Sequence, residues 1–62
     1  MKDELKLKNI IQSVIWFIIQ RNDGVNKESA IRAFYGTRLC RAHGEDLTFQ
    51  DIDRFADLAY CE

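Results

Sequence analysis

Hydrophobic residues are densest near the start of the chain, where residues 10–19 read IIQSVIWFII. This run and its flanks follow the period of an amphipathic helix, so the pattern predicts a helix over residues 3–21. At 100° per residue, that helix gains one broad apolar face, wide enough to contact two neighbouring helices. We therefore expect the side chains of this face to lie in the core: Leu7, Ile10, Ile11, Val14, Ile15, Phe17 and Ile18.

Three further apolar residues fall among polar positions on the back of the same helix: Leu5, Trp16 and Ile19. Single exposed apolar residues are ordinary, but three on one side are not. Tryptophan is also enriched at the centres of protein interfaces. We therefore predict a protein interface centred on these three residues, with Lys8 and Gln12 at its rim. The alternative is that the third helix or the N-terminus covers the three side chains within the same chain.

Turn and cap signals divide the rest of the chain into two more helices. Asn22-Asp23-Gly24 has the composition of a helix stop, and Asn26 is a suitable N-cap for a second helix over residues 27–43. Gly36 interrupts the pattern of that helix, where it allows a close approach or marks a bend. Gly44 is expected to cap its C-terminus.

The third predicted helix has the clearest local signal. Thr48 and Asp51 fit a capping box, with Leu47 and Ile52 placed as a hydrophobic staple, and the helix is expected over residues 49–61. One face of this helix is apolar, whereas the other carries Asp53 and Asp57. The pattern therefore predicts an all-α fold of three helices, arranged as an up-down-up bundle or, if Gly36 bends the second helix, orthogonally.

The length of the chain favours association. Its 62 residues form one domain over residues 1–62, and a domain of this size buries too little surface to be more than marginally stable alone. With 47% hydrophobic and 31% charged residues the composition is that of a folded protein. We therefore expect a small domain that forms a dimer.

Charge and hydropathy bear on the environment of the protein. The formal net charge of −1 gives no overall attraction to nucleic acid or an anionic membrane. The first residues alternate in charge sign, which differs from a signal peptide, and the apolar run of ten residues is about half of a bilayer span. We expect a cytoplasmic protein that does not enter a membrane.

Metal, disulfide and catalytic sites are not expected. Cys40, His43 and Cys61 provide one close-spaced pair of ligands, and Cys61 would lie about 20 Å away if the second and third helices are antiparallel. That distance also excludes a bridge between the two cysteines. His43 has no serine or cysteine obviously paired with it. We predict no metal, no cofactor, no small-molecule substrate and no enzymatic activity.

Nucleic-acid binding is the alternative function. Four basic residues on the second predicted helix could contact phosphates: Lys27, Arg32, Arg38 and Arg41. Against this, the last helix, which usually reads DNA in small trihelical folds, carries Asp51, Asp53, Asp57 and Glu62 against one arginine. The preferred hypothesis is a small protein-interaction module, a regulator, inhibitor or adaptor, that first binds a second copy of itself and then a larger protein.

Overall fold

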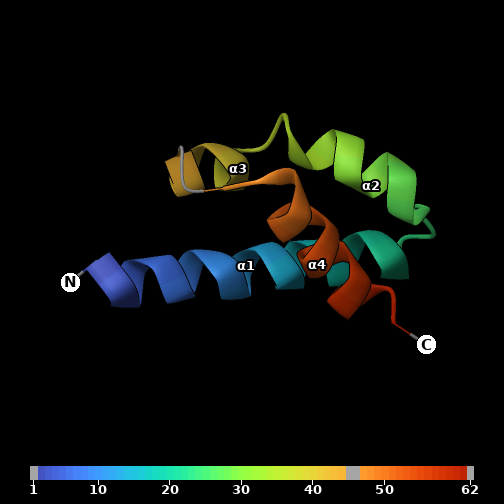
Figure 1. The fold of residues 1–62 in the computed structure, drawn as a ribbon. Coiled ribbons are helices and arrows are strands. Elements are labelled where there is room, and N and C mark those ends of the chain that lie inside the picture. The colour runs from blue at the N-terminus through green and yellow to red at the C-terminus, as the bar shows by residue number, and fades with distance from the viewer. Residues whose placement is uncertain (1, 45–46, 62) are drawn as a thin grey trace.

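The computed structural model describes residues 2–44 and 47–61, and the regular secondary structure of this part of the chain is entirely helical (Figure 1). The helices are α1 (Lys2–Asn22), α2 (Lys27–Phe34), α3 (Arg38–His43) and α4 (Phe49–Ala59). Figure 1 shows α1 as one long rod, with α2 and α3 running back along it in the opposite direction. The all-α prediction is confirmed, but the described residues form four helices rather than three. Glu45, Asp46 and Glu62, part of the acidic C-terminal segment, lie outside the described residues.

The end of α1 is set by Gly24, as its sequence predicts. The amide of Val25 donates to the carbonyl of Gln20 at 3.0 Å, and the amide of Gly24 donates to the carbonyl of Arg21 at 3.0 Å. This pair of bonds is a Schellman motif, in which the residue just after the C-cap of the helix adopts a left-handed backbone conformation. Gly24 supplies it with φ of 85°. The chain therefore turns sharply and returns along α1.

The predicted helix over residues 27–43 is wrong as one element, because it divides into α2 and α3 around Gly36 and Thr37. Asn26 caps α2 by accepting from the amide of Ser29 at 2.8 Å. Thr37 then caps α3: its hydroxyl accepts from the amide of Cys40 at 3.2 Å and donates to the carbonyl of Phe34 at 2.6 Å. A side chain that satisfies both ends in this way makes a break more favourable than a continuous helix.

The start of α4 matches its sequence signal. Thr48 Oγ1 accepts from the amide of Asp51, and Asp51 Oδ2 accepts from the amide of Thr48, both at 3.2 Å. Ile52 is buried, and Leu47 packs against the core next to it, as a hydrophobic staple would. The helix ends at Ala59, two residues before the predicted end at residue 61.

The core is an aromatic cluster between α1 and α2, closed by α4. Phe17 and Phe34 are fully buried and stack with their ring centroids 5.1 Å apart. The ring of Trp16 contacts both rings edge-on, at 5.0 Å and 5.5 Å. The small side chains of Ala56 and Ala59 let α4 approach the other helices closely. The remaining core residues are Ala30, Ile52 and Phe55.

Polar side chains of α1 bind the C-terminal ends of two other helices. Arg21 Nη1 donates to the carbonyl of Ala59 at 3.2 Å, and Asn9 Nδ2 donates to the carbonyl of Ala42 at 3.4 Å. The last carbonyls of a helix have no partner within it, so these bonds satisfy groups that packing would otherwise leave unpaired. The α1 helix therefore contributes polar as well as apolar contacts to the fold.

Two phenylalanines provide a matched test of this core. Phe34 is fully buried, whereas Phe49 is 75% exposed. We expect Phe34→Ala to lower the free energy of unfolding by about 3–5 kcal/mol, because it removes the centre of the aromatic cluster. Phe49→Ala should cost about 1 kcal/mol or less, since it loses mainly an edge contact with Tyr35. Urea unfolding measures both, and equal losses would contradict this assignment of the core.

Candidate functional site

The face of α1 that meets the other helices differs from the predicted one by about a quarter turn. Its centre is Ser13 and Phe17, both fully buried, and Ile10, Val14 and Trp16 pack against the core beside them. The expected core residues Leu7, Ile11, Ile15 and Ile18 are instead among the exposed large hydrophobic residues. The prediction placed the most apolar side of the helix inward, and for these four residues it is wrong.

Polar contacts on the inner face favour this orientation of α1. Ser13 Oγ donates to the carbonyl of Asn9 at 2.7 Å and lies 2.8 Å from His43 Nε2. With its hydrogen directed at the Asn9 carbonyl, Ser13 Oγ is placed to accept a hydrogen bond from the tautomer of His43 that is protonated on Nε2. Asn9 itself binds the end of α3 through Ala42. These bonds hold the polar side of α1 against α3 and leave the aliphatic side facing solvent.

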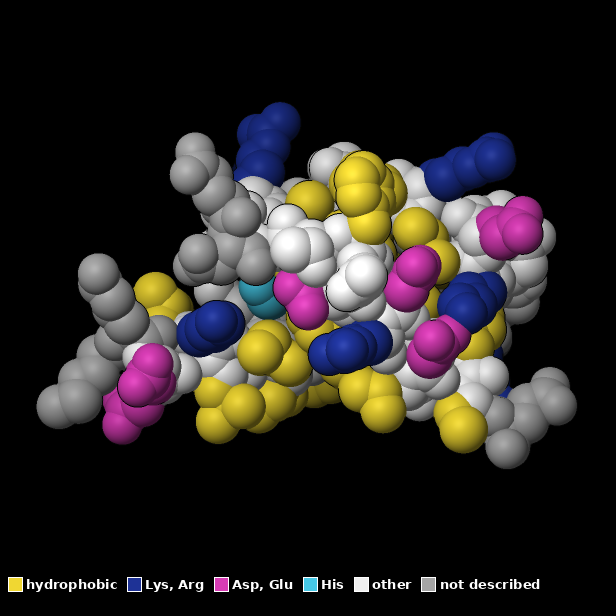
Figure 2. Space-filling view, in the orientation of Figure 1, with side chains coloured by type: hydrophobic (Ala, Val, Ile, Leu, Met, Phe, Trp, Pro, Cys, Tyr) yellow, Lys and Arg dark blue, Asp and Glu magenta, His cyan; other side chains and the backbone are white. Residues whose placement is uncertain are grey.

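Four of these exposed residues form a continuous row, here called the α1 stripe: Leu7, Ile11, Ile15 and Ile18. Their exposed fractions are 57%, 50%, 49% and 41%. The spacing of four, four and three residues keeps them on one side of the helix over about 17 Å. Figure 2 shows hydrophobic side chains gathered along the lower edge of the molecule, over α1.

The predicted interface residues are separated by the structure. Leu5 and Ile19 are 60% and 50% exposed, and Lys8 and Gln12 are exposed on the same helix. Trp16 is half-buried, and its ring contacts Phe17 and Phe34 in the core. Trp16 therefore lies partly in the core of its own chain, and its role in an interface stays a prediction. Ile19 borders the α1 stripe, whereas Leu5 faces a groove on the other side of α1.

The four basic residues of the alternative hypothesis do not share one helix. Lys27 and Arg32 lie on α2, and Arg38 and Arg41 lie on α3, beyond the break. Lys27 forms an ion pair with Asp57 of α4, and this hydrogen bond raises the pKa of Lys27. Figure 2 shows basic side chains spread over this side of the molecule and interspersed with acidic ones. The four basic residues therefore do not lie on one continuous helix, as the sequence-based hypothesis assumed.

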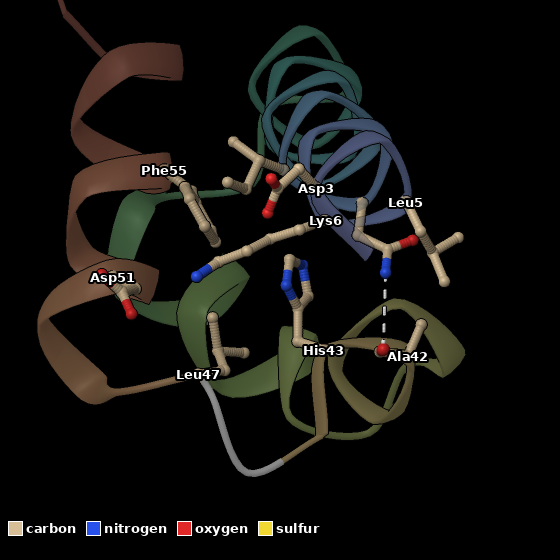
Figure 3. A pocket seen from close by; sticks show the side chains of 10 residues that line it. Asp3, Leu5, Lys6, Ala42, His43, Leu47, Asp51 and Phe55 are labelled. Carbon is tan, nitrogen blue, oxygen red and sulfur yellow. Dashed lines mark hydrogen bonds between the residues drawn. The ribbon is translucent and has the colours of Figure 1, made fainter. Parts of the chain in front are cut away.

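A groove of about 520 Å³ lies where the first turns of α1, the end of α3 and the start of α4 meet. Figure 3 shows Lys6 reaching across it toward Asp51, with His43 projecting into it from α3. The ring of His43 stacks on Phe55 with centroids 5.7 Å apart. Thr48 hydrogen bonds lower the pKa of Asp51, with smaller contributions from Arg54 and Lys6. The groove is thus lined by two carboxylates, one ammonium group and His43, together with apolar side chains.

The pairing of Ser13 with His43 is a contact that the sequence did not reveal. Thirty residues separate the two side chains, and only the return of the chain along α1 brings them together. Ser13 is fully buried and its hydroxyl hydrogen is used within α1, so it serves as a structural link between α1 and α3. Burial lowers the pKa of His43, and the Asn9 carbonyl and Asp51 oppose this effect.

The remaining features are the two cysteines, groups of side chains that could bind a metal, and helices that could span a membrane. Cys40, half-buried, and Cys61, exposed, are both free thiols. Across residues 2–44 and 47–61, histidine, cysteine and acidic side chains do not gather in groups of three or more that could hold a metal. None of the described helices combines the length and apolarity needed to cross a membrane.

Comparisons with protein-family models, with curated proteins and with solved structures find no match for this chain.

The His43 contact predicts how stability changes with pH. Its pKa in the folded protein lies below the ordinary value of 6.5, so the unfolded chain binds a proton first as the pH falls. The free energy of unfolding should therefore fall as the pH drops below about 6.5, by at most about 1.4 kcal/mol per pH unit. Chemical unfolding between pH 7.5 and pH 5 measures this slope.

His43→Gln is the matched variant, because it removes the titrating group and keeps a polar side chain. Its slope over the same interval should be flatter. Asp51 does not interfere, since its lowered pKa confines its effect to pH values below the ordinary 3.8. Equal slopes in the two proteins would show that His43 is not shielded from solvent as described.

Proposed function

We propose that this chain is a small protein-interaction module that associates, first with a second copy of itself, through the α1 stripe. The observation that carries this proposal is the row of four aliphatic side chains exposed on the longest helix. Scattered apolar residues are normal on protein surfaces, but a continuous apolar row is typical of contact sites. The four side chains of the stripe can contribute apolar contacts to a partner, and none of them can form a hydrogen bond.

The form of the stripe favours another helix as its partner. Side chains at spacings of four, four and three residues form a ridge that fits the groove of a facing helix. Helices that bind in grooves are recognised through anchors with this spacing. Isoleucine and leucine lose only about 0.5–1 kcal/mol of rotamer freedom on burial, less than long polar side chains lose. An aliphatic helix surface is thus the most favourable complement.

A second copy of the chain meets these requirements. Burying four half-exposed aliphatic side chains stabilises a complex by roughly 3–6 kcal/mol, which is little against the cost of association. In a homodimer both partners contribute a stripe, so the gain is about twice as large. Association also stabilises the folded state of a domain whose own core is small. A role as a regulator, inhibitor or adaptor that presents its remaining surface to a larger protein fits this size.

The α1 stripe can be tested with two lysine substitutions on one helix. Ile15→Lys puts a charge at the centre of the stripe, whereas Leu5→Lys puts it on an exposed residue outside the stripe. We expect the wild type and Leu5→Lys to sediment as dimers at concentrations of hundreds of micromolar. Ile15→Lys should be monomeric, because a dimer would bury two unpaired ammonium groups.

Circular dichroism of each variant checks that the helices remain. A wild-type chain that stays monomeric at these concentrations would overturn self-association. Loss of the dimer in Leu5→Lys but not in Ile15→Lys would assign the contact to the other side of α1, near the interface predicted from the sequence.

A further inference from the structure

We infer that two copies of the chain pack with their α1 helices antiparallel, around a two-fold axis level with residue 13. This inference rests on the proposed function and specifies the arrangement of its partner. The exposed positions that lie on or beside the α1 stripe have a symmetric spacing about residue 13: Glu4, Leu7, Lys8, Ile11, Ile15, Ile18, Ile19 and Asn22. A two-fold axis at that level places Ile11 opposite Ile15 of the second copy.

The symmetric spacing matters because a two-fold interface must fit itself. Leu7 of one copy lies at the level of Ile19 of the second copy and Lys8 at the level of Ile18, so isoleucine and leucine meet at the centre of the contact and lysine side chains lie toward its ends. Each residue pair occurs twice in such an isologous contact. A register shifted by one turn would instead leave one isoleucine of each copy beyond the end of the partner stripe. The register centred on residue 13 thus buries more aliphatic surface than one shifted by a turn.

Like charges beside the α1 stripe disfavour the parallel direction. Glu4 and Lys8 are both exposed. A parallel, in-register pair would set Glu4 against Glu4 and Lys8 against Lys8. The antiparallel pair places Glu4 beside Asn22 of the second copy, whose amide can donate to the carboxylate, and it aligns the helix dipoles favourably.

The space needed by a second helix is free in the described structure. The α2 and α3 helices return along α1 on the side where Asn9, Ser13 and Phe17 are buried or half-buried. The stripe residues keep between 41% and 57% of their surface exposed, so the described residues cover neither end of the row. A second α1 can lie along the full stripe without displacing any of these helices.

Spin labels at two positions distinguish the arrangements. Asp3→Cys and Gln12→Cys are prepared separately in a Cys40→Ala, Cys61→Ser background, labelled with a nitroxide and measured by pulsed electron paramagnetic resonance. In the antiparallel dimer the two copies of residue 3 are about 30 Å apart along the helices, whereas the two copies of residue 12 are about 3 Å apart along them. The expected result is one long and one short distance.

Short distances at both positions would mean a parallel dimer and would overturn the inferred arrangement, as would a long distance at residue 12. Either result leaves self-association itself intact. A chain that is monomeric by sedimentation would overturn the proposed function as well. If that monomer binds vesicles of phosphatidylcholine and phosphatidylserine, the occupant of the stripe is a lipid surface and not a second copy.

A pair of charge substitutions provides a second test without labels. Asn22→Lys should tighten the dimer severalfold, because it faces Glu4 of the second copy, and Asn22→Glu should weaken it by a similar factor. In a parallel dimer residue 22 faces itself, so both substitutions would weaken association. Dissociation constants from sedimentation equilibrium distinguish the two patterns.

Discussion

The rest of the structure depends on the hydrogen bonds that fix the rotation of α1. Ser13 and Asn9 bind the end of α3, and Arg21 binds the end of α4. Turning the helix to bury Ile11 and Ile15 would move these side chains away from their partners. Of these side chains Ser13 is fully buried, and a buried polar group left without a partner costs about 1–3 kcal/mol, which is comparable to the gain from burying one aliphatic side chain. This bond and the aromatic contacts of Trp16 and Phe17 with Phe34 together oppose the apolar preference of the helix.

Local features of the fold were accessible from the sequence because they arise within a few residues. Asn26 caps a helix through an amide three positions away, and Thr48 and Asp51 bind each other across the same interval. Gly24 supplies the left-handed conformation that ends α1. The break after α2 was signalled at Gly36, but Thr37 supplies its hydrogen bonds. Composition alone does not show which of two adjacent residues stabilises a turn.

The orientation of α1 was not accessible in the same way, because it is set by partners about thirty residues distant. A helical wheel weighs each residue by its own polarity, so it places isoleucine inward and serine outward. Ser13 is buried because His43 meets it, and Trp16 is drawn to the core because Phe34 lies beside it. An apolar row on the outer face of the helix was therefore predicted, but none of its residues belongs to the α1 stripe, which Ile19 alone borders.

The α1 helix has two faces suited to burial, but a chain of this length has few other helices to cover them. The inner face of α1 is covered by α2, α3 and α4, and the described chain has no further helix to cover the outer face. The same polar bonds that stabilise the fold thus leave an aliphatic surface that another chain can bury at little entropic cost. The proposed second copy would cover this surface while the contacts among α1, α2, α3 and α4 stay as they are in the monomer.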